Sequence, residues 1–403
     1  MGTQTIEKLD EMIYKHIPKG SKIVETKISN LTAPGDNYGS QIYKVDMKVK
    51  RESGDIGDLN VVAKQIPDSE YYQEVFNIQV TFNIEKEFYN TIVPTLYEFQ
   101  KKYNVPASDS FPRFYGARNN LNGVNNVVDK DGLIVLENLK IKGYINLDRT
   151  VGFDLSTSKL ILEDLARFHA TTLAIKLKEP ATFEKKIKPH CSCFLKHPAS
   201  LELDYEANEL ASVLEEAEIG RKLMPQFRKS IKYMGTLRTT FREPFSTVVH
   251  RDFWVNNIML QFEEGAVKNI KIVDFQMYTY DTPATDLMFF LFTSVQTQVL
   301  KQHFEELIEH YHEILAQTLL IFGCDISPFT YEKLLEEISA CMKTELGKMM
   351  FMLLFIIRGP KGGHPNSDPK EIPQLNVKHL NREDKDRLFW LLKEFDKRGW
   401  VNF

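Results

Sequence analysis

The fold of this chain is decided by one stretch, Val248-Val249-His250-Arg251-Asp252-Phe253-Trp254-Val255-Asn256-Asn257-Ile258-Met259. An aspartate follows a short apolar run there, with a histidine two positions before it and an asparagine five positions after it. A second stretch, Ile272-Val273-Asp274-Phe275-Gln276, places another aspartate seventeen positions beyond Asn257. Because both aspartates follow short β-rich runs, we expect them where strands give way to loops.

This spacing fits the chemistry of phosphoryl transfer. Transfer to a hydroxyl needs a carboxylate that orients or deprotonates the attacking oxygen, and oxygen ligands for the magnesium bound to the nucleotide phosphates. Asp252, Asn257 and Asp274 supply those parts. Taken alone, either aspartate would more often cap a turn or end a strand. The joint spacing, with His250 in front, favours the catalytic interpretation.

The motif also resembles a known family. His-Arg-Asp-Phe-Trp-Val-Asn-Asn matches the His-x-Asp-x-x-x-x-Asn motif of protein kinases, aminoglycoside phosphotransferases and choline kinases. Trp254 within it, and Asp-Phe-Gln in place of Asp-Phe-Gly, resemble the ecdysteroid kinase-like (CHK-kinase-like) family. The resemblance implies ATP as phosphate donor, with Mg²⁺. It also implies Asp252 as catalytic base, His250 as a brace of the catalytic loop, and Asn257 and Asp274 as magnesium ligands. Many members have Gly where this chain has Arg251.

Two residues of the N-terminal third fit the same family. Lys64 ends an apolar strand segment, where a kinase places the lysine that holds the α- and β-phosphates. Glu85 lies on the helix predicted to follow, in a segment similar to the family's Glu-x-x-x-Tyr, and an ion pair between the two would fix the lysine. Glu87 should face elsewhere on that helix. Without the downstream motif, Lys64 would be read as a surface lysine on an edge strand.

The loop ahead of the first alternating strand resembles the family's Gly-Asp-Asn-Tyr-x-Ser pattern. Glycines let backbone amides approach phosphates closely, and a serine hydroxyl adds a donor. Alone, such a loop would be an ordinary turn, but its position ahead of Lys64 favours contact with the nucleotide. The loop residues expected to make that contact are Gly35, Asn37, Tyr38, Gly39 and Ser40.

A connector between two lobes is expected at Leu136-Glu137-Asn138-Leu139, which is similar to the family's Leu-Glu-Asp-Leu. We expect its backbone, at Glu137 and Leu139, to hydrogen-bond the adenine edge. Residues 1–138 would then form a nucleotide-binding N-lobe. Residues 139–403 would form a helical C-lobe with the catalytic loop and the substrate pocket.

The hydrophobic pattern predicts a small sheet-rich lobe followed by a large helical lobe. The family resemblance implies that this is an α+β, two-lobed protein-kinase-like fold, with a small antiparallel sheet in the N-lobe and a mainly helical C-lobe. Pro94 should bend or split the first long helix. The predicted strands are Gln41–Lys50, Leu59–Ile66, Pro112–Ala117, Gly123–Val128, Leu133–Leu136, Ser246–His250 and Ile270–Asp274. The predicted helices are Thr81–Lys102, Leu160–Leu173, Leu203–Glu218, Met224–Phe241, Leu300–Leu320 and Tyr331–Ile357.

The composition argues against several other classes of protein. The 403 residues carry a net charge of -4 and no strongly basic stretch, so no nucleic-acid partner is indicated. The longest apolar run, Met349–Ile357, is nine residues, too short for a membrane span. Four cysteines are too few for a disulfide scaffold, which favours a reduced, cytoplasmic protein. The one-residue gap between Cys191 and Cys193 does not fit the usual spacing of zinc ligands.

The resemblance implies a small-molecule hydroxyl substrate, a steroid or another lipophilic alcohol, phosphorylated for hormone inactivation or detoxification. The apolar run Met349–Phe355 could line such a pocket, although ordinary core is the simpler interpretation. A protein kinase is disfavoured because Pro283 lies nine positions beyond Asp274, leaving little room for an activation loop. A catalytically silent binding protein remains an alternative. The oligomeric state is open.

Overall fold

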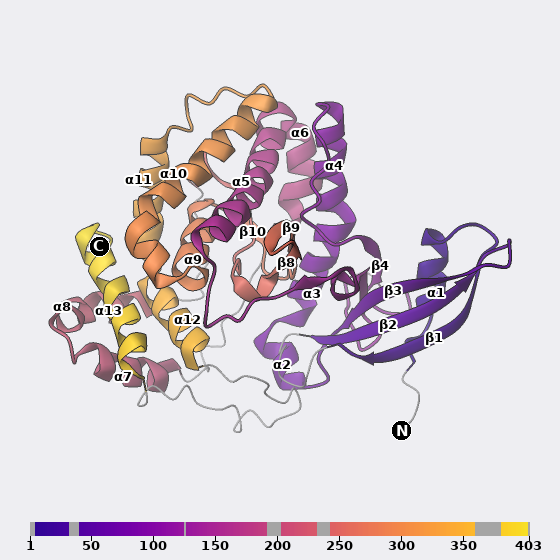
Figure 1. Cartoon of the computed structure of the whole chain (residues 1–403), viewed down its shortest axis with the longest axis horizontal. Coiled ribbons are helices and arrows are strands. Elements are labelled where there is room, and N and C mark those ends of the chain that lie inside the picture. Colours follow the sequence, from indigo (N-terminus) through magenta and orange to yellow (C-terminus); the bar gives the residue numbers. More distant parts are fainter. Residues whose placement is uncertain are drawn as a thin grey trace.

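The computed structural model describes residues 5–31, 40–124, 126–191, 203–231, 242–358 and 380–401. A sheet-rich lobe at the N-terminal side is followed by a much larger, mainly helical lobe, and the helices α3 (Ile78–Glu87) and α4 (Val93–Lys102) lie between the sheet and the helical lobe (Figure 1). The predicted α+β, two-lobed fold class is therefore confirmed. The expected division at residue 138 stays a prediction.

The N-lobe is built on one antiparallel sheet of five strands in the order β1-β2-β3-β5-β4. On β2, Val45, Met47 and Val49 alternate with more exposed residues and are buried, because successive side chains point to opposite faces. The first helix, α1 (Leu9–Ile13), buries Leu9 and Ile13 in the same small core. The strands are β1 (Lys22–Asn30), β2 (Gln41–Lys50), β3 (Ile56–Gln65), β4 (Phe114–Arg118) and β5 (Leu133–Glu137).

The segment after β3 is helical and contains one irregular turn. Short α2 (Glu70–Val75) leads into α3 (Ile78–Glu87), a π-helical turn at Phe88–Ile92, and α4 (Val93–Lys102). Pro94 is the second residue of α4, two positions after the last residue of the π turn. A proline has no N–H to donate and its ring crowds the preceding turn, which accounts for an irregularity there. Pro94 thus divides the helix, as predicted.

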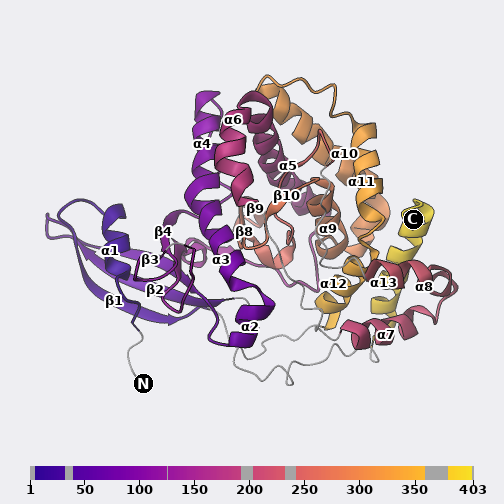
Figure 2. The ribbon, with the colours of Figure 1, turned by 180° about the vertical axis from the view of Figure 1, so that it is seen from behind.

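The C-lobe consists mostly of helices, with two small antiparallel sheets of orders β10-β7 and β6-β8-β9 among them (Figure 2). Its helices are α5 (Leu155–Lys178), α6 (Pro180–Thr182), α7 (Leu203–Leu214), α8 (Glu218–Ile231), α9 (Ala284–Ser294), α10 (Thr297–Ile321), α11 (Tyr331–Met342), α12 (Leu346–Arg358) and α13 (Arg382–Lys397). Its strands are β6 (Tyr144–Ile145), β7 (Thr247–Val249), β8 (Ile258–Glu263), β9 (Ala266–Ile272) and β10 (Thr279–Asp281). Every residue of α9 is buried, so this helix forms the centre of the lobe.

Two element predictions were wrong. The described residues of 123–128 form no strand, because the Asn120 side chain bonds the backbone of Val124 and Val127 and holds them in a loop. The single helix predicted over Tyr331–Ile357 is two helices, α11 and α12, with a turn between them. Part of the helix predicted over Met224–Phe241 lies outside the described residues.

Candidate active site

The candidate catalytic loop runs from the end of β7 to the short 3₁₀ turn Val255–Asn257, and a buried aspartate on α9 holds it in shape. The backbone N–H of His250 donates to Asp286 Oδ2 at 2.5 Å, and that of Arg251 donates to Asp286 Oδ1 at 2.7 Å. Asp286 is fully buried. Burial favours a higher pKa, but the hydrogen bond from His169 and those from the loop hold the pKa of Asp286 below its ordinary value. Asp286 is therefore a structural anchor of the loop.

The position of Arg251 requires an unusual backbone conformation. Its φ is 70°, in the left-handed region that favours glycine. Many members of the family that the motif resembles carry Gly at this position. Arg can occupy it here because hydrogen bonds hold both its backbone and its side chain. Arg251 Nη1 donates to Asp281 Oδ2 on β10 at 3.1 Å, and the Asp286 carboxylate takes the Arg251 N–H.

His250 joins the catalytic loop to the segment that carries the second aspartate. Its Nε2 lies 3.0 Å from the carbonyl oxygen of Val273, and its Nδ1 lies 3.3 Å from the backbone N–H of Asp252. The carbonyl can only accept and the N–H can only donate, so the ring is the tautomer protonated at Nε2. The His250 ring therefore fixes Asp252 relative to Asp274.

Asp252 and Asn257 interact directly. Asn257 Nδ2 donates to the Asp252 backbone oxygen at 2.8 Å and to Asp252 Oδ2 at 2.9 Å. Burial, reinforced by the nearby charge of Asp274, raises the pKa of Asp252. A raised pKa makes the carboxylate a better proton acceptor, as a general base requires.

Lys64 on β3 joins the N-lobe to this site. Its Nζ lies 2.6 Å from Glu85 Oε2 on α3 and 2.8 Å from Asp274 Oδ1. The Lys64–Glu85 ion pair expected from the sequence is therefore present. Burial alone would lower the pKa of Lys64, but the charges of Asp274 and Glu85 raise it above its ordinary value, so the ammonium stays protonated. Glu87 instead accepts from Thr91.

A pair of stacked aromatic rings supports these charged groups, and the sequence analysis missed it. Phe275, the residue after Asp274, stacks on Phe88 with ring centroids 3.5 Å apart and an interplanar angle of 8°. The His250 ring lies 4.4 Å from the Phe275 ring. Phe88 is three residues after Glu85, hence on the same side of the helical segment. The stack therefore connects the helix of Glu85 to the loops of Asp252 and Asp274.

The residues predicted as magnesium ligands fit such an ion chemically. Both hydrogens on Asn257 Nδ2 are used by Asp252, which leaves Asn257 Oδ1 as the oxygen for a cation. Asp274 uses Oδ1 for Lys64, and its Oδ2 remains for a ligand. A carboxylate and an amide oxygen are ligands that Mg²⁺ accepts. In the described part of the chain, no group of three or more His, Cys, Asp or Glu side chains is arranged for a metal.

The connector residues lie at the lobe junction. The Glu137 N–H donates to the Arg113 backbone oxygen at 2.8 Å, and Glu137 Oε2 accepts from the Arg113 N–H at 3.1 Å. Leu139 packs with Tyr144 and Met259 in a small separate apolar cluster. The Glu137 N–H is therefore already used, whereas the Leu139 side chain is buried in that apolar cluster.

The remaining predictions fall partly outside the described residues. Gly35, Asn37, Tyr38, Gly39 and Cys193 lie there. Ser40, directly before β2, is described and is buried. Cys191 is buried, with its thiol bonded to the Ile187 carbonyl oxygen.

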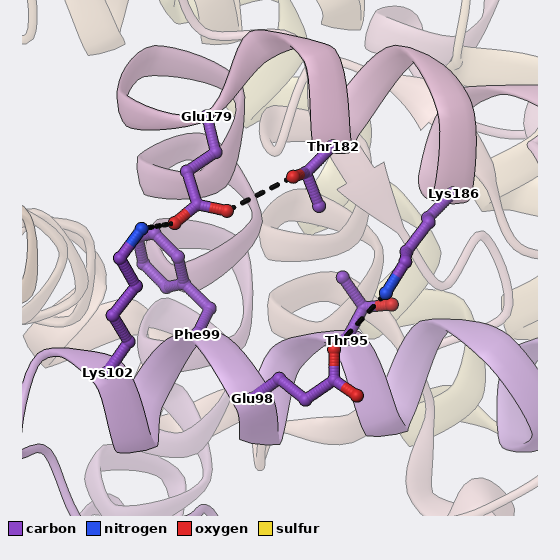
Figure 3. A pocket seen from close by; sticks show the side chains of 7 residues that line it. All are labelled: Thr95, Glu98, Phe99, Lys102, Glu179, Thr182 and Lys186. Atoms are coloured by element: carbon purple, nitrogen blue, oxygen red, sulfur yellow. Dashed lines mark hydrogen bonds and ion pairs between the residues drawn. The ribbon is translucent and has the colours of Figure 1, made fainter.

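A cavity of about 200 Å³ lies away from all these residues, between α4 and the segment around α6 (Figure 3). Its lining charges are already paired. Lys102 pairs with Glu179, and Lys186 Nζ lies 3.2 Å from Glu98 Oε2. None of its lining residues belongs to the candidate active site.

Comparison with known proteins identifies the family. The sequence profile of the ecdysteroid kinase-like family matches residues 34–324, so the chain belongs to that family. This is a kinase-like family of small-molecule phosphotransferases. No curated protein matches the chain. The matched segment contains Lys64, Glu85, Asp252, Asn257 and Asp274.

Similar solved structures are aminoglycoside phosphotransferases. The ADP-bound APH(2'')-Ib is 15% identical over 98% of this chain and 100% of that chain, with a TM-score of 0.32. The GDP and kanamycin complex of APH(2'')-IIIa is 11% identical over 98% and 99%, with a TM-score of 0.38. The GDP complex of wild-type aminoglycoside 2'-phosphotransferase-IIIa is 10% identical over 98% and 100%, with a TM-score of 0.37.

Among the described residues, no helix combines the length and the apolar character needed to cross a membrane.

Proposed function

We propose that this protein is an ATP-dependent kinase that transfers the γ-phosphate of ATP to an alcohol hydroxyl of a small lipophilic molecule. The observation that carries the proposal is the connected set of charged residues at the lobe junction. Lys64 bridges Glu85 and Asp274, Asn257 bonds Asp252, and the His250 ring joins the two loops. A silent binding protein would have no need for the full set.

Each residue has a defined task in this proposal. Lys64, fixed by Glu85, binds the α- and β-phosphates as a protonated ammonium. Asp252 orients the acceptor hydroxyl and takes its proton, and its raised pKa suits it to do so. Asn257 Oδ1 and Asp274 Oδ2 would hold Mg²⁺, which neutralises charge on the phosphate oxygens when bound.

The proposed nucleotide site continues at the connector. Leu139, Tyr144 and Met259 form a buried apolar cluster there, against which the adenine ring would pack. Because the Glu137 N–H is occupied, the adenine edge is assigned to other backbone groups of the connector. Ser40, with the loop before it, is assigned to the phosphates.

An apolar acceptor is supported by the surroundings of the catalytic loop. Trp254, two residues after Asp252, lies 6.2 Å ring to ring from Phe355 on α12. Phe355 and Met352 are partly exposed, whereas their neighbours on α12 are mostly buried. An aromatic and thioether surface beside the base suits the apolar body of an ecdysteroid or another lipophilic alcohol. Hormone inactivation or detoxification would follow from such a substrate.

The test is ATP consumption by the purified protein with Mg²⁺ and a panel of ecdysteroids, other sterols, choline and aminoglycosides. Turnover that depends on a lipophilic alcohol is the expected result. Turnover with choline or aminoglycosides alone would overturn the substrate class. Nucleotide binding without turnover on any alcohol would favour the silent binding protein instead.

A further inference from the structure

Lys348 on α12 lies beside the catalytic loop, although the family match ends before it, at residue 324. Its Nζ lies 3.4 Å from the backbone oxygen of Arg251, the residue before Asp252. The ammonium also lies 4.4 Å from the centroid of the Phe289 ring on α9. Because α12 packs against α9, this side chain is held next to the loop that carries the proposed base.

Lys348 differs from the other cations near the catalytic loop because it has no carboxylate partner. Lys64 pairs with Glu85 and Asp274, and Arg251 pairs with Asp281. Within the described residues, Lys348 forms no ion pair, and its single hydrogen bond is the long one to Arg251. The carboxylates of Glu345, Asp252 and Asp286 lie near enough to favour its charged form, but none of them forms an ion pair with it. A partly buried ammonium with no direct anionic partner is costly. A bound anionic ligand would compensate that charge.

The face of α12 that carries Lys348 continues along the proposed acceptor site. Met352 and Phe355 follow at positions four and seven residues later, on the same face of a helix. Phe355 contacts Trp254 of the catalytic loop, and the Arg149 guanidinium lies 5.0 Å from its ring centroid. The face from Lys348 to Phe355 therefore follows the catalytic loop, with the cation at the end nearer Arg251.

We propose that Lys348 binds the γ-phosphate of ATP and stabilises the phosphoryl group during its transfer. This assignment rests on the proposed kinase function. In the step, the bond from the γ-phosphorus to the β–γ bridging oxygen breaks, and the acceptor oxygen forms its bond to that phosphorus. The acceptor proton passes to Asp252, and ADP leaves with the electron pair of the broken bond. Lys348 keeps its proton and offsets the charge on the transferred oxygens.

The test compares Lys348→Met with Lys343→Met, which removes an exposed lysine at the end of α11. Calorimetry measures the Kd of Mg-ATP and of Mg-ADP for each variant, and Lys348→Arg tests for recovery of the charge. Because a charge-assisted hydrogen bond is lost, Lys348→Met should weaken Mg-ATP binding by about 10- to 100-fold. Binding of Mg-ADP should change by less than about 2-fold, since ADP lacks the γ-phosphate. Lys343→Met should change neither.

Two results would count against the assignment in different ways. Equal effects of Lys348→Met on both nucleotides, or no effect on either, would overturn the role of Lys348 and leave the kinase function standing. A wild-type protein that binds neither nucleotide would overturn the kinase function, and the assignment with it. Unchanged Mg-ADP binding by Lys348→Met also shows that the variant is folded.

Discussion

Replacing Asp286 with Asn should loosen the catalytic loop and destabilise the protein. The Asp286 carboxylate accepts from the backbone N–H groups of His250 and Arg251, and His169 Nε2 lies 3.2 Å from its Oδ2. A carboxylate can only accept, so His169 Nε2 donates to it, while His169 Nδ1 lies 2.7 Å from the Tyr311 hydroxyl oxygen. In Asp286→Asn, one carboxylate oxygen is replaced by an NH₂ group. That group faces an N–H donor, so at least one of these hydrogen bonds is lost.

The expected size of the effect follows from these contacts. An unsatisfied buried donor costs about 1–3 kcal/mol, and loss of the charge weakens the hydrogen bonds that remain. Together these terms predict that the free energy of unfolding falls by about 2–4 kcal/mol. Because Arg251 sits in a left-handed conformation, a loosened loop should also shift Asp252. The turnover rate should therefore drop on the order of 100-fold, since small misplacements of catalytic groups are costly.

Urea denaturation and steady-state turnover, measured on the same preparations, test this prediction. Tyr311→Phe is the matched control, because it removes a hydrogen bond from His169 and leaves both loop contacts of Asp286 in place. It should cost about 1 kcal/mol and leave turnover nearly unchanged. An Asp286→Asn variant that is as stable and as active as wild type would refute the anchoring role.

The contribution of the Asp286 carboxylate to stability should depend on pH. The pKa of Asp286 is lower in the folded state than its unfolded value of about 3.9. Its contribution to stability is therefore present above about pH 4 and is lost as the pH falls through the folded pKa. The stability difference between wild type and Asp286→Asn should shrink below about pH 4.

Three further predictions test other parts of the site. Lys64→Met leaves the buried Glu85 carboxylate and the partly exposed Asp274 carboxylate without their cation. The free energy of unfolding should therefore fall by about 3–5 kcal/mol in urea titrations, and a nucleotide titration should show weaker Mg-ATP binding. Arg251→Gly relieves the left-handed backbone strain but loses the ion pair with Asp281, so the free energy of unfolding should change by no more than about 1 kcal/mol. Arg251→Val should be clearly less stable than wild type in the same denaturation experiment, because a β-branched residue disfavours that conformation. Phe355→Ala should raise the KM of a lipophilic alcohol more than it changes the Kd of Mg-ATP, and an equal effect on both would count against an acceptor site at α12.

The sequence predicted those parts of the fold whose pattern is local. The alternation on β2 and the apolar stripe of α5 were both readable, and so was the effect of Pro94. Helix α9 was missed because it is buried on every side and therefore shows no periodicity. Strand β1 was missed because most of its residues are exposed, so polar and apolar residues do not alternate regularly along it.

The candidate site was predictable where residues share a motif, and not where they meet only through folding. The spacing of His250, Asp252 and Asn257 is local, and the Lys64–Glu85 pair was expected from the family resemblance. The Phe88–Phe275 stack joins residues almost two hundred positions apart, and no local pattern marks it. Lys348 directly precedes the apolar run Met349–Ile357, and no sequence pattern distinguishes it from an ordinary surface lysine. Only the folded structure shows what it contacts.

Transfer of labelled phosphate from [γ-³²P]ATP to an alcohol, compared between wild type and Asp252→Asn, tests the central claim most directly. Asp252→Asn keeps the size of the side chain and removes the proton acceptor. The variant should bind Mg-ATP about as tightly as wild type while labelling of the alcohol falls by about 10²- to 10⁴-fold, the usual contribution of a general base. Equal labelling by both proteins would contradict the assignment of Asp252 as the base and, with it, the proposed kinase chemistry of the site.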